Sequence, residues 1–302
     1  MSQHTISLSG SHTIPDQMVT NILQAISNIS KSKDLNLENY KKFEDEKNRI
    51  QKQGAGLEIF IKDSFCGIPL GSIPNEERIK NYLKEFSDTG HANNPPDAMI
   101  IGGDAMEIKK HEGFSESNIA LNSSPPRTIL TDEDRNITNQ TQNCEQRPWK
   151  RDYLYIIGNQ KSSKLRRIML CYGNCFVAFD NIYRDFFDKI KKSISEGDIG
   201  GAKFRDSKEF GRIYEIDPQN FTKLRIRSMF ELKNPNDIFE NEIGWQGDED
   251  LVISAIMQKK KFDSFPEKDR DSLKDFEIRN FKGKNPDSPK EEIDLVLIRY
   301  SR

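Results

Sequence analysis

The chain has little of what marks several large protein classes. No apolar run approaches the roughly 18 residues that a membrane-spanning helix needs, and the first thirty residues show no basic start followed by an apolar stretch. Four cysteines and four histidines, scattered through 302 residues, do not suggest a disulfide scaffold. We therefore expect a cytoplasmic protein with no membrane segment and no secretory signal.

Two of the cysteines, Cys171 and Cys175, are four residues apart inside an apolar stretch. A zinc site usually has more closely spaced pairs and two further ligands. We interpret both as buried structural thiols, and a zinc or redox role stays open as the alternative.

The chain also has no strong excess of positive or negative charge, since its formal net charge is only -2. Its distribution is uneven, however. The segment 147–227 has 18 Lys and Arg against 10 Asp and Glu, whereas 235–302 has 12 against 16. The middle of the chain could present a phosphate-facing surface, although the same counts also describe solvated helix faces.

What the chain does have is a mixture of helical and strand patterns. Helical spacing of apolar residues begins at Ile14, with Asp16 as a plausible cap, and recurs at 57–65, 76–86 and 181–196. The stretch 57–65 is short enough to be a strand instead. We expect strands at 97–101, 105–109, 152–158, 165–179, 212–216 and 222–232. The segment 258–289 is charged and weakly patterned.

One pair of expected strands carries a candidate metal-dependent centre. Pro96-Asp97 precedes the first strand, and Glu107-Ile108-Lys109 lies on the second. Hydrolysis of a phosphodiester needs a nucleophilic water and neutralised charge, which a hard cation such as Mg²⁺ held by carboxylates can supply. Period two puts Glu107 and Lys109 on one strand face, where the lysine could orient the water. These residues therefore predict a nuclease site.

The turn between the two strands gives a geometric test. A three-residue turn of Gly102-Gly103-Asp104 would pair Met99 with Glu107 and Asp97 with Lys109, and so place Asp97 on the face of Glu107. A two-residue turn would place it on the opposite face. We predict the three-residue turn, or a bulge with the same effect.

The motif alone is weakly specific, since a charged hairpin edge with Lys109 and Lys110 would look the same. Its surroundings are more specific and resemble the NgoPII family of type II restriction endonucleases. The matching stretches are Gly56-Leu57-Glu58, Phe60 to Asp63, Asn94 to Met99, Gly103 to Lys110, Ile119 to Ser124, Phe210 to Ile213, Asp217-Pro218, Leu224 to Arg227 and Asn234-Pro235. The resemblance runs from about residue 16 to about 258.

This resemblance implies an α/β fold with a mixed central β-sheet flanked by helices, the PD-(D/E)xK nuclease core. It implies Mg²⁺-dependent hydrolysis of double-stranded DNA with 5′-phosphate ends, at GGCC in the family's named member. Asp97, Glu107 and the backbone carbonyl of Ile108 would bind the metal. Lys109 would assist the attacking water and Glu58 would support the site. A homodimer, which suits a palindromic site, and a paired DNA methyltransferase would accompany the enzyme.

Residues that contact DNA are harder to identify. Arg225 and Arg227 share a strand face and could pair with guanine in the major groove. Asn122, Ser123, Ser124 and Arg127 lie in a loop soon after the catalytic strand. Phosphate contact or plain solvated charge is the alternative for each.

Three domain segments follow: a flexible N-terminus at 1–15, a nuclease domain at 16–258 and a C-terminal extension of unknown role at 259–302. Two other functions stay open. One is a repair or recombination nuclease of the same fold, which would lack dimer symmetry and strong sequence preference. The other is a catalytically idle DNA-binding module, which would have no need of Asp97, Glu107 and Lys109 together.

Overall fold

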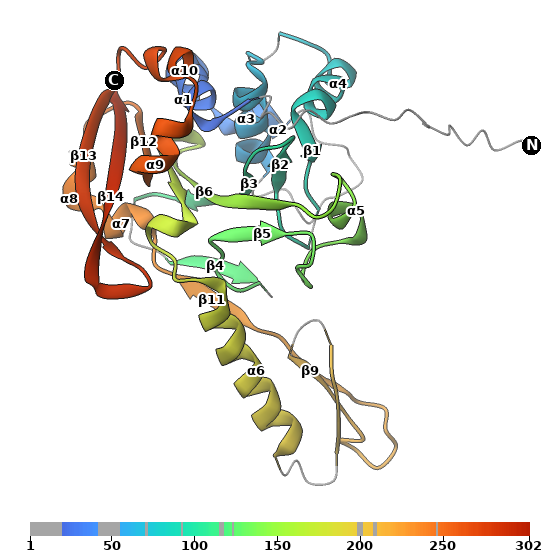
Figure 1. Ribbon diagram of the computed structural model, residues 1–302. Helices are drawn as coiled ribbons and strands as arrows, with labels where there is room; N and C mark the ends of the chain where they lie inside the picture. The colour runs from blue at the N-terminus through green and yellow to red at the C-terminus, as the bar shows by residue number, and fades with distance from the viewer. Residues whose placement is uncertain are drawn as a thin grey trace, which may run out of the picture.

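The computed structural model describes residues 20–41, 55–69, 72–91, 93–114, 118–122, 124–197, 202–207, 210–245 and 247–302. Within these residues a large mixed β-sheet forms the centre of the molecule, and helices α1, α3 and α4 cover one side of it (Figure 1). This confirms the expected α/β fold with a mixed central sheet flanked by helices. No helix in the described part of the chain is both long and apolar enough to cross a bilayer.

Neighbouring strands of the central sheet follow the order β1, β2, β3, β6, β7, β12, β14 and β13, with β5 paired to β6. Only the β3–β6 and β7–β12 pairs among these are parallel. The strands are β1 (Phe86–Asp88), β2 (Ala98–Ile100), β3 (Ala105–Glu112), β5 (Ile129–Thr131), β6 (Lys150–Lys161), β7 (Lys164–Tyr172), β12 (Val252–Gln258), β13 (Glu277–Asn285) and β14 (Ser288–Ser301).

Among the described residues, two smaller sheets lie outside the central one. The strands β4 (Ile119–Asn122) and β11 (Met229–Leu232) pair with each other, and β8 (Lys203–Arg205), β9 (Gly211–Tyr214) and β10 (Leu224–Ile226) form a three-stranded sheet. The helices are α1 (Ile22–Lys31), α2 (Leu37–Lys41), α3 (Ala55–Cys66), α4 (Asn75–Glu85), α5 (Asn139–Gln142), the short 3-10 helix η1 (Gly173–Cys175), α6 (Asp180–Glu196), α7 (Pro235–Ile238), α8 (Glu240–Ile243), α9 (Lys259–Ser264) and α10 (Glu267–Asp271).

Strongly periodic segments fold as the sequence predicts. The stretch 57–65 lies in helix α3, while 76–86 and 181–196 correspond to α4 and α6. The first helix begins at Ile22, where the Asn21 side chain accepts hydrogen bonds from the next backbone N–H groups. Asp16, expected as its cap, lies outside the described residues.

Three expected segments differ from the structure. The strand expected at 165–179 ends at Tyr172, because the chain turns at Gly173, where a Cβ would lie 2.2 Å from the carbonyl oxygen of Arg127. The strand expected at 222–232 is two strands, β10 and β11, which pair with different partners. The weakly patterned 258–289 contains α9, α10 and β13.

The segment 259–302, expected as a C-terminal extension of unknown role, supplies part of the central sheet. Strand β14 pairs with β12 from Val252 to Gln258, and its Leu295–Ile298 stretch is buried. Strand β13 is an edge strand with most side chains exposed, so it lacks an apolar face that a sequence pattern could reveal.

Candidate active site

The β2–β3 hairpin puts the two candidate carboxylates on one face of the sheet. Met99 pairs with Ala105 and Ala98 pairs with Met106. When this register is extended by one residue, Asp97 lies opposite Glu107. The expected pairing of Met99 with Glu107 was wrong by two residues along β3. A register shift of two residues leaves each side chain on the same face of the sheet, so Asp97 and Glu107 still share a face. The turn is Ile101-Gly102-Gly103, closed by a hydrogen bond from Ile100 N to Asp104 O (3.0 Å).

The shift has a local cause at both ends of the turn. Gly102 takes a φ of +64°, which glycine adopts readily. Asp104 is buried rather than placed in the turn, because its carboxylate accepts hydrogen bonds from the Tyr172 hydroxyl (2.5 Å) and the Lys261 ammonium (2.8 Å). The three-residue turn therefore lies one residue earlier than expected.

Glu107 and Lys109 contact each other directly. The Lys109 Nζ lies 2.6 Å from Glu107 Oε1, and the two side chains are 29% and 12% exposed, so solvent reaches the lysine more readily. On the neighbouring strand β6, Gly158 pairs with Lys110, and a Cβ at Gly158 would lie 2.7 Å from the Leu57 side chain of α3. Lys110 thus faces α3, and Glu107 and Lys109 face the other side of the sheet.

Asp97 is fixed against the backbone of β3. Its N–H donates to Met106 O (2.9 Å), and its Oδ2 accepts from the N–H of Ile108 (2.6 Å). The N–H and C=O of a strand residue point to the same side, so the Ile108 carbonyl also faces the Asp97 side of β3. Two carboxylates and one backbone carbonyl therefore converge at the open end of β2.

The electrostatics of this group favour a bound cation. Burial, and next the charges of Glu107 and Glu58, raise the pKa of Asp97 to about 8. Burial opposes the charge of Lys109, but Glu107 and Asp97 outweigh it and raise the pKa of that ammonium. Asp97 and Glu107 both act on Lys109, the charge of Glu58 adds to theirs, and a divalent cation would relieve the repulsion among the carboxylates.

Within the described residues, no three His, Cys, Asp or Glu side chains gather closely enough to form a complete protein cage for a metal. Mg²⁺ sites on phosphoryl substrates usually take one or two carboxylates and complete the shell with water and phosphate. Asp97 and Glu107 with the Ile108 carbonyl fit that donor set. The residues present thus fit Mg²⁺ better than zinc, which prefers nitrogen and sulfur ligands.

Glu58 lies in the first turn of α3, at the margin of the group. Its Oε2 is 4.0 Å from the Nζ of Lys62, whose ammonium also donates to Thr89 O (2.7 Å). Its charge acts on Asp97 and Lys109, but no direct contact with either is present among the described residues. The expected supporting role of Glu58 is therefore electrostatic at most in this conformation.

Tyr153 is a contact of Glu107 that the sequence motif does not include. Its hydroxyl donates to Glu107 Oε2 (2.7 Å), so Lys109 and Tyr153 hold the two oxygens of one carboxylate. Tyr153 is 2% exposed and lies on β6, in parallel register with Ala105. Only the pairing of β3 with β6, 46 residues apart in sequence, brings it to the site.

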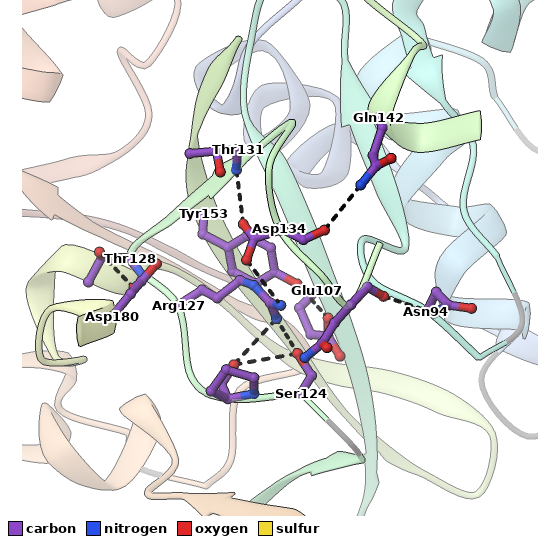
Figure 2. A network of polar contacts seen from close by, with 12 residues as sticks. Asn94, Glu107, Ser124, Arg127, Thr128, Thr131, Asp134, Gln142, Tyr153 and Asp180 are labelled. Atoms are coloured by element: carbon purple, nitrogen blue, oxygen red, sulfur yellow. Dashed lines mark hydrogen bonds and ion pairs between the residues drawn. The ribbon is translucent and has the colours of Figure 1, made fainter. Parts of the chain in front are cut away.

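Beneath Tyr153 lies Arg127, the centre of the polar network in Figure 2. Its guanidinium is 6.0 Å from the Tyr153 ring centre, 3.7 Å from the Asp134 carboxylate, and hydrogen-bonded to the Ser124 hydroxyl. Its backbone N–H donates to the Tyr155 hydroxyl (2.8 Å), which holds the loop against β6.

This placement changes the assignment of the loop residues. Arg127 and Ser124, expected to contact DNA, are buried (2% and 8% exposed). The cause is the packing of the loop on Tyr153 and Tyr155, and no edge of the guanidinium is offered to a DNA base. We therefore assign Arg127 to the residues that surround Glu107. A buried cation there favours the ionised form of a nearby carboxylate.

The remaining candidate DNA residues are exposed or lie outside the described residues. Asn122 is exposed at the end of β4, and Ser123 lies outside. Arg225 on β10 and Arg227 just after it are both exposed, on the part of the chain that extends from the core with α6 (Figure 1). They are far from the loop of Arg127 in sequence and belong to a different surface.

Cys171 and Cys175 are both buried in the core, at the end of β7 and in η1. Burial, and next the contact with Cys175, raise the pKa of the Cys171 thiol. A thiol of raised pKa is a poor nucleophile and a poor metal ligand, which agrees with a structural interpretation.

Comparisons with known proteins point to one family. The family model of the NgoPII restriction endonuclease matches residues 20–287. The type II restriction enzyme NgoPII of Neisseria gonorrhoeae is 34% identical over 285 residues, which is 93% of this chain and 99% of that enzyme. No solved structure matches the chain. The family match includes β2, β3 and β6, and thus every strand of the site.

Proposed function

From the membership of this chain in the NgoPII restriction endonuclease family, we propose that it is a type II restriction endonuclease that hydrolyses double-stranded DNA at a specific sequence with the help of Mg²⁺. The observation that carries the proposal is the convergence of Asp97, Glu107 and Lys109 on one face of the β2–β3 hairpin. A chain with no catalytic use for this group would gain nothing from two mutually repelling carboxylates beside one lysine.

Asp97, Glu107 and the Ile108 carbonyl would hold the cation. When bound, the cation supplies positive charge to the phosphate and makes a water molecule more acidic. Asp97 is kept in place by the N–H of Ile108, and Glu107 by the Tyr153 hydroxyl. These contacts limit the rotamers of both carboxylates, so little reorganisation is needed when substrate arrives.

Lys109 takes the role of a charged donor. Because neighbouring carboxylates raise its pKa, its ammonium keeps its protons at neutral pH and does not act as a general base. It can orient the attacking water by hydrogen bonding, and it can offset charge on the phosphate. The partial exposure of Lys109 leaves it accessible to substrate.

The finer features of the proposal come from the family resemblance. The products would have 5′-phosphate ends, and the target would be GGCC. A palindromic target matches a two-fold symmetric enzyme, so we propose a homodimer in which each copy cuts one strand. The enzyme would act in the cytoplasm, beside a methyltransferase that protects host DNA.

Cleavage of plasmid DNA tests the proposal. Wild-type protein with Mg²⁺ should produce discrete fragments, whose mapped ends give the target and the position of the phosphate. Asp97→Ala and Lys109→Ala should each lower the cleavage rate about a thousandfold, as loss of a transition-state charge contact does. Lys110→Ala is the matched control, because Lys110 is adjacent but faces α3.

The results can contradict the proposal at two levels. Cleavage by Lys109→Ala at the wild-type rate would refute the assigned site. Cleavage at another palindrome would correct the target and leave the enzyme class intact. Random degradation, or none, in the presence of Mg²⁺ would contradict a sequence-specific endonuclease.

A further inference from the structure

The three-stranded sheet β10–β9–β8 carries an unusual row of charges. In its antiparallel register Arg212 pairs with Arg205 on one side and with Arg225 on the other. Residues directly opposite in antiparallel strands project from the same face. Three arginines therefore stand side by side across the sheet, with adjacent strands about 4.8 Å apart.

The same face carries two more residues that suit a polyanion. Lys203 pairs with Tyr214 in the register, and the Arg205 guanidinium lies 4.7 Å from the centre of the Tyr214 ring. Lys203 also forms an ion pair with Glu215 (2.9 Å). We call Lys203, Arg205, Arg212 and Arg225 the arginine face.

The opposite face of this sheet is apolar. By strand alternation it carries Phe204, Ile213 and Ile226, which are half-buried, and Leu224, which is exposed. Most of the packing of this sheet comes from the apolar face, and none of the residues of the arginine face is buried.

Like charges placed directly opposite in a sheet destabilise it. Among the described residues no carboxylate lies within ion-pair distance of Arg205 or Arg212. No carboxylate thus offsets the repulsion at these two residues within the described part of the chain, although Arg205 also contacts the Tyr214 ring. A row of like charges that costs stability and is not matched by carboxylates suits the binding of an external anion.

The position of the arginine face relative to the site also fits. The arm formed by α6 and β8–β10 extends from the side of the central sheet opposite α1 and α3 (Figure 1). Glu107 and Lys109 face that same side, since Lys110 faces α3. A long polyanion lying over the carboxylates could therefore reach the arm.

We propose that the arginine face binds the phosphate backbone of duplex DNA, which rests on the proposed nuclease function. DNA carries closely spaced negative charge along its whole length, and arginine binds phosphate with paired N–H groups. A second copy of this chain is a poorer occupant, because two arginine faces would repel each other. The contact would fix DNA over the site without reading sequence.

Salt dependence of DNA binding tests this proposal. Binding of a labelled GGCC duplex and of an unrelated duplex would be measured by fluorescence anisotropy, without divalent metal, at several salt concentrations. Each phosphate contact contributes about 0.9 to the slope of log K against log salt. Arg205→Ala/Arg212→Ala should lower that slope by about 1.8 and weaken binding to both duplexes alike.

Two control variants separate charge from structure. Arg212→Lys keeps the charge and should keep most of the slope. Lys282→Ala removes an exposed cation from the edge strand β13, and should leave both affinity and slope unchanged. The double variant should also unfold at a temperature no lower than wild type, because its substitutions relieve repulsion, and an unchanged far-UV circular dichroism spectrum would verify the fold.

Several results would overturn the proposal. An unchanged salt slope in the double variant would show that these arginines do not contact phosphate. A loss of affinity confined to the GGCC duplex would indicate base reading. A changed sedimentation coefficient with unchanged DNA affinity would indicate a protein interface. Melting of the arm in the double variant at lower temperature would assign the arginines a structural role instead. If wild-type protein binds neither duplex, the proposed function itself fails, and the proposal with it.

Discussion

The hairpin of the candidate site and the arm of α6 with β8–β10 are built on opposite principles. The carboxylates belong to the β2–β3 hairpin, and β3 pairs with β6, which is buried on both faces over most of its length. None of the residues of α6, all of which the structure describes, is buried. Acidic charge is thus held by a rigid core, and basic charge is carried on a thinly packed arm.

The difference follows from what each region has to do. Catalytic groups need positions fixed within a fraction of an ångström, which close packing and hydrogen bonds from Ile108 and Tyr153 provide. Phosphate contacts are sequence-independent and tolerate adjustment. An arm with exposed cations can adapt to DNA at little cost, because it has few core contacts to lose.

Single core and arm substitutions should separate the two regions most strongly. Ile156→Ala, at a fully buried position on β6, should lower the free energy of unfolding by about 2–5 kcal/mol through lost burial and a cavity. Ile182→Ala, at a half-exposed position on α6, should change it by no more than about 0.5 kcal/mol. Urea unfolding of both variants measures the contrast, and equal losses would show that the arm is packed like the core.

Tyr153→Phe removes the hydrogen bond to Glu107 and leaves an aromatic ring of nearly the same volume in place. The phenyl ring keeps the packing on Arg127, but Glu107 loses a charge-assisted hydrogen bond of about 1.5–3 kcal/mol. Cleavage should therefore slow by about 10- to 100-fold. The Mg²⁺ concentration for a half-maximal thermal shift should also rise, whereas metal-free DNA binding should stay unchanged.

A purely structural role for Tyr153 would give a different pattern. Tyr153→Phe would then lower the unfolding temperature without moving the Mg²⁺ midpoint. Tyr155→Phe is the matched control, since Tyr155 lies on the same face but accepts its hydrogen bond from the Arg127 backbone. It should leave the Mg²⁺ midpoint near the wild-type value.

The sequence predicts the site only as far as local rules extend. The shared face of Glu107 and Lys109 follows from strand alternation, and the hairpin follows from its glycine turn. Tyr153 was missed because its contact depends on a parallel pairing between distant strands. Arg127 was predicted to contact DNA because a charged residue in a loop does not reveal whether the loop packs against the core.

The fold shows the same limit. Central strands with continuous apolar residues, such as β6 and β7, were predicted, while the edge strand β13 was not. The basic character of 147–227 was visible in the composition, but the row formed by Arg205, Arg212 and Arg225 depends on register across three strands. Pairing between strands is a tertiary property, and a single sequence constrains it weakly.

The pH dependence of stability should differ in sign between the two regions. At the site, the pKa of Asp97 is raised to about 8, so the folded state binds a proton more tightly than the unfolded state. Its contribution is complete below about pH 4 and is lost as the pH rises toward 8. Metal-free protein should therefore melt at a lower temperature at pH 8 than at pH 5, and Mg²⁺ should restore much of the loss.

Asp97→Asn isolates this effect, because the amide does not titrate. Its melting temperature in EDTA should fall less than that of the wild type between pH 5 and 8. Parallel curves for the two proteins would show that Asp97 does not cause the dependence.

The smallest effect on stability is expected at Asp206, which links the segment after β8 to α6 by an ion pair. The ion pair with Lys191 of α6 lowers the pKa of Asp206, so its contribution is present above about pH 4 and is lost as the pH falls. Asp206 is mostly exposed, and screening by solvent and salt limits an exposed pair to about 0.2–1 kcal/mol. Asp206→Asn should leave global melting almost unchanged but speed hydrogen exchange in α6 at neutral pH. At pH 3 the variant and wild type should exchange alike, and a persistent difference there would show that the aspartate acts through packing rather than charge.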